Sequence, residues 1–200
     1  MHISDGILTA PIVISTSVVS LGLVIYSLKH LKDDDIALVS AMSAMFFISS
    51  FIHIPLGPTQ IHLIMIGVIG ILLGSKVFIA VFIALLLQAT LLGYGGLSSL
   101  GANLLIMALP AFITYILVSR GLLNSFAVKI RYFLIGFIPI CLATLFMALL
   151  LALSKEEYLY AAYTVMAANV PVMIIEGLVT LFLINYLKKS IPWVLKGAKV

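Results

Sequence analysis

Apolar runs long enough to cross a lipid bilayer follow one another along almost the whole chain, separated by short polar or charged connections. A helix needs about 20 apolar residues to span the hydrocarbon core, and its backbone satisfies its own polar groups in lipid. Hydrophobic residues make up 64% of the chain and charged residues 9%, which excludes an ordinary soluble domain. The sequence therefore predicts an all-α integral membrane protein with one domain, residues 1–200.

Seven apolar segments are predicted to be membrane-spanning helices. The third is short enough to be typical of a buried or re-entrant segment. In the second, Ala37, Ser40, Ala41 and Ala44 share one side, and Gly70 and Gly74 form a G-x-x-x-G pattern in the third. Such small residues are typical of close helix packing in membranes. The segments cover residues 8–28, 36–54, 61–74, 77–93, 102–118, 132–153 and 163–187.

The positions of Lys and Arg decide the predicted topology, because cytoplasmic loops carry an excess of these residues. With seven crossings and an outer N-terminus, ten basic residues lie inside and only Lys155 lies outside. If segment 61–74 did not cross, three would lie inside and eight outside. We therefore expect an outer N-terminus and a cytoplasmic C-terminus in the cell membrane. The basic end KKSIPWVLKGAKV is expected to contact anionic lipid.

The chain opens with MHISDGIL, which places a histidine next to the terminal amine. The amine of Met1, the amide nitrogen of His2 and the imidazole of His2 can close a five-membered and a six-membered chelate ring on one metal. Nitrogen donors in tetragonal geometry suit Ni²⁺ and Cu²⁺, and Co²⁺ is feasible. The predicted topology puts this chelate on the outer face.

Two further histidines, His53 and His62, flank the predicted outer loop IHIPLGPTQIHL, in which Pro55 and Pro58 interrupt any helix. Either imidazole could supply a fourth nitrogen, and either could instead be an interfacial side chain bonded to a carbonyl. A histidine near a membrane face is a candidate functional residue. The clustering of three of the four histidines at this face favours a metal site.

Motifs for enzymatic chemistry are absent from the sequence. It has no H-E-x-x-H metallohydrolase pattern and no G-x-x-x-x-G-K-[ST] phosphate loop. The chain is therefore not expected to hydrolyse ATP itself. Glu176 is the one charge well inside a predicted span, and it could form a structural hydrogen bond, unwind the helix around Pro171, or take part in ion passage or coupling.

Four stretches resemble the CbiM/NikM family, the substrate-binding (S) components of cobalt and nickel energy-coupling factor (ECF) ABC transporters. They are MHISDGIL, PLGPTQIHLIMIGVIGILLG, LLQATLLGYGGLSSLGANLLIMAL and ANVPVMIIEGLVT, in the family's order. One departure is Tyr94, where members usually carry Asp or His before the glycine pair.

This resemblance implies seven helices and a site for Ni²⁺ or Co²⁺, with no resident cofactor. The implied ligands are Met1, His2 and His62. His53, Asn103 and Gln88 are candidates to orient these ligands by hydrogen bonds, or to be ligands in their place. The partners implied are a transmembrane T component, two ATPase subunits and a small accessory membrane subunit. The small-residue side of the second span is a candidate docking face for the T component. A nucleic acid is not among the expected partners, and an S component for an organic vitamin is the alternative.

Overall fold

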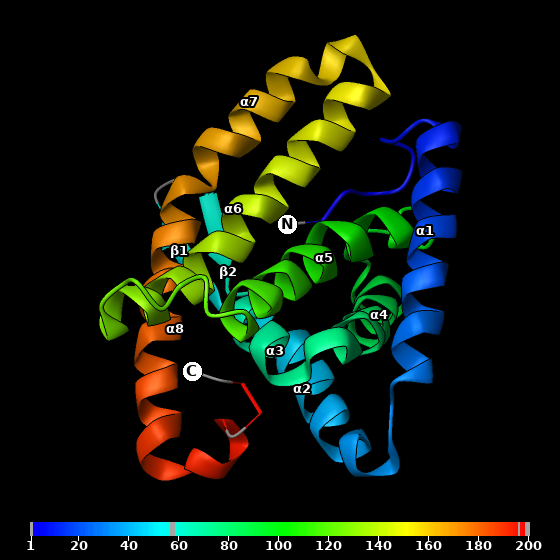
Figure 1. Ribbon diagram of the computed structural model, residues 1–200. Coiled ribbons are helices and arrows are strands. Elements are labelled where there is room, and N and C mark those ends of the chain that lie inside the picture. Colours follow the sequence, from blue (N-terminus) through cyan, green and yellow to red (C-terminus); the bar gives the residue numbers. More distant parts are fainter. Residues whose placement is uncertain (1, 57–58, 196, 199–200) are drawn as a thin grey trace.

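The computed structural model describes residues 2–56, 59–195 and 197–198, and for residues 53–56 and 59–62 it describes the backbone. Helices make up most of this part of the chain (Figure 1). Two short strands, β1 (His53–Leu56) and β2 (Thr59–His62), form an antiparallel hairpin. The helices are α1 (Ala10–Lys29), α2 (Ile36–Ser49), α3 (Ile66–Leu73), α4 (Val77–Leu87), α5 (Leu100–Ser119), α6 (Val128–Ser154), α7 (Leu159–Ala168) and α8 (Val170–Ser190).

Five helical stretches of the described chain are long and apolar enough to cross a membrane. Large apolar side chains on the outside of the bundle, such as Val18 at 66% exposed and Phe182 at 71%, favour lipid surroundings. The chain is therefore a multi-pass membrane protein. Seven crossings and the direction of the termini stay predictions. The five stretches are Ala10–Lys29, Ile66–Leu92, Leu100–Ser119, Val128–Ser154 and Glu156–Ser190.

The second and third predicted spans contain shorter helices than the sequence suggests. α2 has 14 residues and α3 has 8. The prediction of helix over residues 50–54 and 61–65 is wrong, because these residues form turns, strands and a non-helical connection that ends at Met65. Pro55 has no N–H to donate to a helix, and it lies in β1 at the centre of this interruption.

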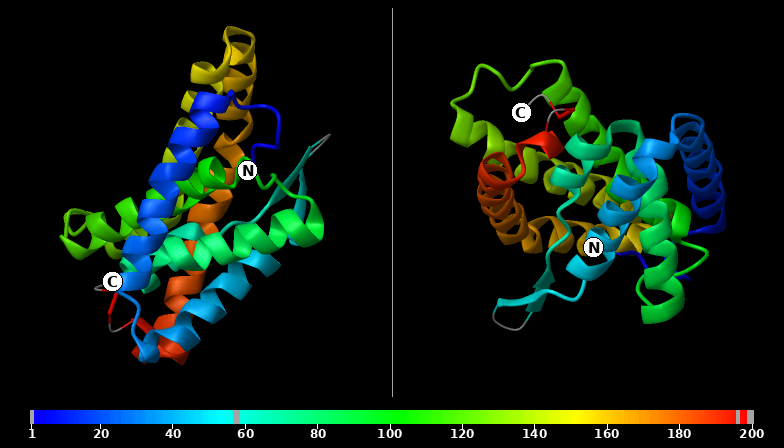
Figure 2. Two further views of the ribbon diagram at one scale, coloured as in Figure 1. Left: turned by 90° about the vertical axis from the view of Figure 1, so that its right-hand side faces the viewer. Right: turned by 90° about the horizontal axis from the view of Figure 1, so that it is seen from below.

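The hairpin pairs the two histidines that flank the predicted loop. In its register His53 lies opposite His62, and Ile54 lies opposite Ile61. The N–H of Leu63 donates to the carbonyl of Ile52 at 3.3 Å, which extends the pairing by one step. Figure 2 shows this hairpin projecting from the helices. The backbone positions of the two histidines are thus fixed relative to each other.

α3 lies in the centre of the bundle and packs against α5 and α6 through its glycines. A Cβ added to Gly67 would lie 2.0 Å from the carbonyl oxygen of Ile135, and one added to Gly70 would lie 2.3 Å from that of Ala111. Gly74 has φ +56° and ends α3, and a Cβ there would lie 3.0 Å from the ring of Tyr115 in α5, so both glycines of the predicted G-x-x-x-G pair approach α5 closely. Backbone therefore approaches backbone, as small residues allow in membrane helices.

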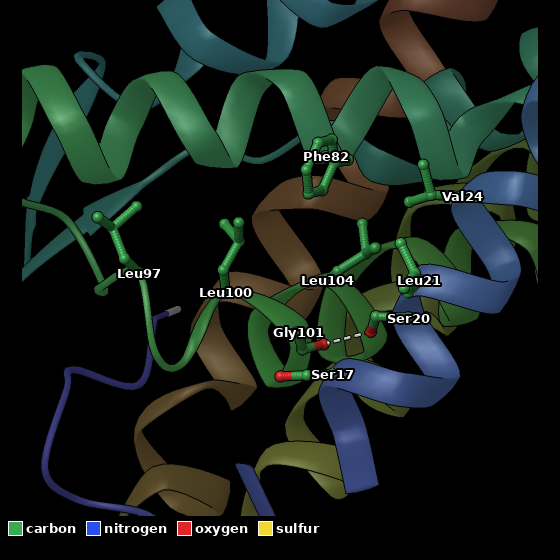
Figure 3. A pocket seen from close by; sticks show the side chains of 9 residues that line it. All are labelled: Ser17, Ser20, Leu21, Val24, Phe82, Leu97, Leu100, Gly101 and Leu104. Carbon is green, nitrogen blue, oxygen red and sulfur yellow. Dashed lines mark hydrogen bonds between the residues drawn. The ribbon is translucent and has the colours of Figure 1, made fainter. Parts of the chain in front are cut away.

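α1 attaches to the bundle through a polar stripe, although it faces lipid along most of its surface. Ser20 donates its hydroxyl to the carbonyl of Gly101 in α5 at 2.6 Å, and Figure 3 shows this bond beside Ser17 at the edge of a groove between α1, α4 and α5. The hydroxyl of Ser27 accepts the N–H of Ile79 at 3.2 Å. Hydrogen bonds between helices are one of the interactions, together with close packing, by which membrane helices associate.

The start of the chain and the hairpin lie on the same half of the molecule. Figures 1 and 2 place both toward the turn between α6 and α7, whereas the α1–α2 connection and the C-terminal residues lie at the other end. The fold therefore brings the segments that carry His2, His53 and His62 to one end of the bundle, and His30, at the end of α1, lies at the other.

Candidate metal centre

The first residues do not form a tail: they fold back from the beginning of α1 into the molecule and run over α5 (Figure 1). Ile3 is 1% exposed and Leu8 is 8% exposed. Burying these two side chains stabilises the inward path of the segment. The structure thus holds His2, the residue next to Met1, partly buried against the bundle.

A side-chain amide fixes the peptide that follows His2. Asn103, at the start of α5, accepts the N–H of Ile3 at 2.8 Å and donates to the carbonyl of Ile3 at 2.9 Å. Ser99 donates its hydroxyl to the same carbonyl at 2.8 Å. Asn103 and Ser99 are buried, so these bonds satisfy backbone groups that water does not reach. Asn103 therefore pairs with the chain as a neighbouring strand would.

Asp5 anchors the segment at a second point. Its carboxylate accepts the hydroxyl of Ser98 at 2.6 Å and the N–H of Ser99 at 2.9 Å, at the beginning of α5. A carboxylate at a helix N-terminus meets unpaired N–H groups and the positive end of the helix dipole. Gly96 leaves the space for it, because a Cβ there would lie 2.1 Å from the carboxyl group.

The hydrogen bond from Ser98 is the main cause that lowers the pKa of Asp5 below its ordinary value. A lowered pKa means that this anchor contributes stability above the ordinary pKa and loses it as the pH falls through the lowered value. We expect Ser98→Ala to move the pKa of Asp5 back up, measured by a carboxyl-carbon NMR titration. Ser15→Ala removes a serine hydroxyl bonded within α1 and should leave this pKa unchanged. An unshifted pKa in Ser98→Ala would contradict this assignment.

The imidazole of His2 contacts Gln88. Its Nε2 lies 3.0 Å from Oε1 of Gln88, which is 1% exposed. An amide oxygen can only accept, so this bond requires the proton on Nε2. The six-membered chelate ring uses Nδ1, and Gln88 therefore favours the tautomer that can bind a metal in this way. The ring of Tyr94 lies 6.1 Å from that of His2, centroid to centroid.

Local backbone geometry places Gln88. It begins a π-helical turn, Gln88–Leu92, at the end of α4, and such turns are frequent at functional sites. Gly93 ends the turn at φ +67° and Gly95 follows at φ +74°, conformations that glycine adopts without strain. A Cβ on Gly95 would lie 2.8 Å from the Asn103 amide and 3.6 Å from His2.

The remaining predicted ligands are placed only in part. Met1 and the side chains of His53 and His62 lie outside the described residues. The backbone of His62 lies in β2, opposite that of His53 in β1. The structure therefore brings together His2, Gln88 and Asn103, which binds the backbone of Ile3. That Met1, His2 and His62 come together at one site stays a prediction.

The small residues of α2 form an exposed face. Ala37, Ser40, Ala41 and Ala44 are all exposed. A hollow of about 320 Å³ continues this face toward Met65, at the end of the hairpin connection. The predicted docking residues are thus accessible on the outside of the bundle.

Sequence reasoning assigned no role to Asp5, Ser98, Ser99 or Gly96. All four lie inside the quoted stretches MHISDGIL and GYGGLSSLGAN. Their pairing joins positions more than 90 residues apart, which no local pattern reveals. The glycine pair Gly95–Gly96 in front of Ser98 and Ser99 was the one sequence pattern that could have indicated a close backbone contact here.

Residues 2–194 match the family described as "Cobalt uptake substrate-specific transmembrane region". A Haemophilus influenzae protein named "Putative metal transport protein" is 33% identical, with 98% of this chain and 97% of the relative covered. The "Cobalt transport protein CbiM" of Geobacter sulfurreducens is 35% identical over 131 residues, which cover 61% of this chain and 38% of that protein.

A solved structure of a truncated transition metal transporter has the same fold. It superposes with a TM-score of 0.81 at 24% identity and covers 94% of this chain and 99% of the solved one. The family match over nearly the whole chain and the full-length relative agree with the resemblance seen in the sequence. The chain belongs to the CbiM family of cobalt uptake transmembrane proteins.

Proposed function

We propose that this protein is the S component of an ECF-type transporter and that it captures Ni²⁺ or Co²⁺ at the outer face of the cell membrane. The observation that carries the proposal is the inward-folded N-terminal segment, which Asn103 holds at Ile3 and in which the imidazole of His2 contacts Gln88. Family membership favours a metal over the vitamin alternative.

The chemistry of the proposed site follows from its donors. The amine of Met1, the amide nitrogen and Nδ1 of His2, and the imidazole of His62 supply four nitrogens in a nearly planar set. Such a set suits Ni²⁺, and Co²⁺ can also occupy it. Binding releases protons from the terminal ammonium, from the amide nitrogen of His2 and from any charged imidazole, so the affinity for metal rises with pH.

Uptake requires the partners that the family resemblance implies. A T component, two ATPase subunits and a small accessory membrane subunit would complete the transporter. The α2 face of Ala37, Ser40, Ala41 and Ala44 would dock on the T component, since small residues let helices approach closely. The proposed role is binding and release of the ion, while the partner ATPases supply the energy.

The test is calorimetric titration of Ni²⁺, Co²⁺ and Zn²⁺ into the purified protein with its native amine. We expect one tight site, much weaker binding by His2→Gln and His62→Ala, and little change in His53→Ala. His53 is a matched control because it lies opposite His62 in the same hairpin. Glutamine is chosen at position 2 because a small residue there would expose Met1 to removal by aminopeptidase. Unchanged binding by His2→Gln would refute the proposed site.

A further inference from the structure

Glu176 is a buried carboxylate to which the proposed metal chemistry assigns no role. It lies in α8, inside an apolar stretch, and is 1% exposed. A carboxylate in the membrane interior is costly unless hydrogen bonds or other charges stabilise it. The groups that contact Glu176 therefore indicate what role this buried carboxylate has.

The contacts of Glu176 are backbone N–H groups from a segment 111 and 112 residues earlier. Its Oε1 accepts the N–H of Ile64. The N–H of Met65 lies 3.1 Å from Oε1 and 3.1 Å from Oε2. Both carboxylate oxygens thus bind the chain between β2 and α3.

This connection has an unusual backbone. Met65 has φ +55°, a left-handed conformation uncommon outside glycine and asparagine, and it immediately precedes the first residue of α3. The first N–H groups of a helix have no partner within the helix. Glu176, in α8, supplies a hydrogen-bond acceptor for the N–H of Met65, and this bond stabilises the turn of the chain from β2 into α3.

The fixed peptides follow His62 directly. Ile64 is two residues after His62, and the intervening Leu63 donates its N–H to Ile52 of the preceding turn. The exit of β2 is therefore held by Ile52 on one side and by α8 on the other. α3, which continues from this point, is itself immobilised by its glycine contacts with α5 and α6.

We propose that Glu176 is a positioning residue for the metal site: it fixes the backbone after β2 and so sets the place of the His62 imidazole. The inference rests on the proposed function, in which His62 supplies the fourth nitrogen. Glu176 itself is not a ligand in this scheme, because both of its oxygens accept backbone N–H groups.

The first experiment compares Ni²⁺ binding by the full-length protein with Glu176→Ala and Glu176→Gln. Glu176→Ala should weaken binding by roughly 10–100-fold, the usual cost of losing a group that orients a ligand. Glu176→Gln should restore part of the affinity, since its amide oxygen can still accept N–H groups. Thr180→Val, one turn further along α8, removes a buried hydroxyl and serves as the matched control with unchanged affinity.

The second experiment places Glu176→Ala in a His62→Ala background. If Glu176 acts through His62, the double variant should bind Ni²⁺ as weakly as His62→Ala alone. The d–d absorption bands of bound Ni²⁺ should then be the same in Glu176→Ala and His62→Ala, because both sites would keep only the N-terminal donors. A residue that merely stabilises the fold would lower the unfolding temperature without changing these bands.

Each outcome has a separate meaning. A second, equal loss of affinity in the double variant would overturn the inference, as would native Ni²⁺ bands in Glu176→Ala. Native affinity in folded Glu176→Ala would also overturn it. By contrast, unchanged binding by His2→Gln would refute the proposed function itself, so the two failures are distinguishable.

Discussion

Two residues, Met-Gln, added in front of Met1 should abolish measurable Ni²⁺ binding. The extension converts the terminal amine into an amide and removes the five-membered chelate ring. It also crowds a segment whose Ile3 is 1% exposed and whose peptide is clamped by Asn103. We expect a loss greater than the roughly 10–100-fold that removal of an orienting group costs. Calorimetric titration of the extended and native proteins measures it.

The length of this extension matters for its interpretation. One added residue would put the histidine at position 3, where amine, two amides and imidazole form a chelate of four nitrogens by themselves. Two residues avoid this arrangement. The control carries the same two residues after Val200, and both proteins are compared by thermal unfolding. Native affinity in the N-terminally extended protein would exclude the Met1 amine as a ligand.

Gly67→Ala should be strongly destabilising. The new Cβ would lie 2.0 Å from the carbonyl oxygen of Ile135 and 2.9 Å from its carbon, both backbone atoms that no rotamer change can move. Overpacking of a core costs about 1–3 kcal/mol and occasionally more, and a backbone collision belongs at the upper end. The unfolding temperature in detergent, followed by intrinsic fluorescence or scanning calorimetry, is the measurement.

Gly22→Ala is the matched control for this substitution. Gly22 lies in α1, and a Cβ there meets nothing within 4 Å. Alanine is favoured over glycine in a helix by up to about 1 kcal/mol, so this variant should be as stable as the wild type or slightly more so. Equal unfolding temperatures for the two variants would mean that α3 has room to shift away from α6.

The helical, membrane-spanning character of the chain was predictable because hydrophobicity alone requires it. The hairpin was not: Ile54 and Ile61 suit a span as well as a strand, and Pro55 signals an interruption without showing what replaces the helix. α7 and α8 were merged for a related reason, since Asn169 separates two helices within one apolar run. Length and composition do not reveal such local breaks.

The candidate site was predictable where its chemistry is local. His2 beside the terminal amine predicts a chelate by its spacing, which stays a prediction because Met1 lies outside the described residues. Gln88 and Asn103, which the structure places at His2 and Ile3, are polar groups in apolar surroundings. Glu176 was visible as a buried charge, but its partners are backbone N–H groups. Every residue except proline has a backbone N–H, so the sequence does not show which N–H groups a carboxylate will bind. The role of Glu176 therefore becomes visible only in the folded structure.

The molecule contains a helical frame, which consists of α3 with α5 and α6, and a latch, which is the N-terminal segment before α1. A helix seated by glycine on neighbouring carbonyls cannot slide or turn without collision, so these helices form the frame. The N-terminal segment is held by hydrogen bonds with Asn103, Ser98 and Ser99, each worth about 1 kcal/mol. Lifting this latch would therefore break these hydrogen bonds and leave the helices of the frame in place.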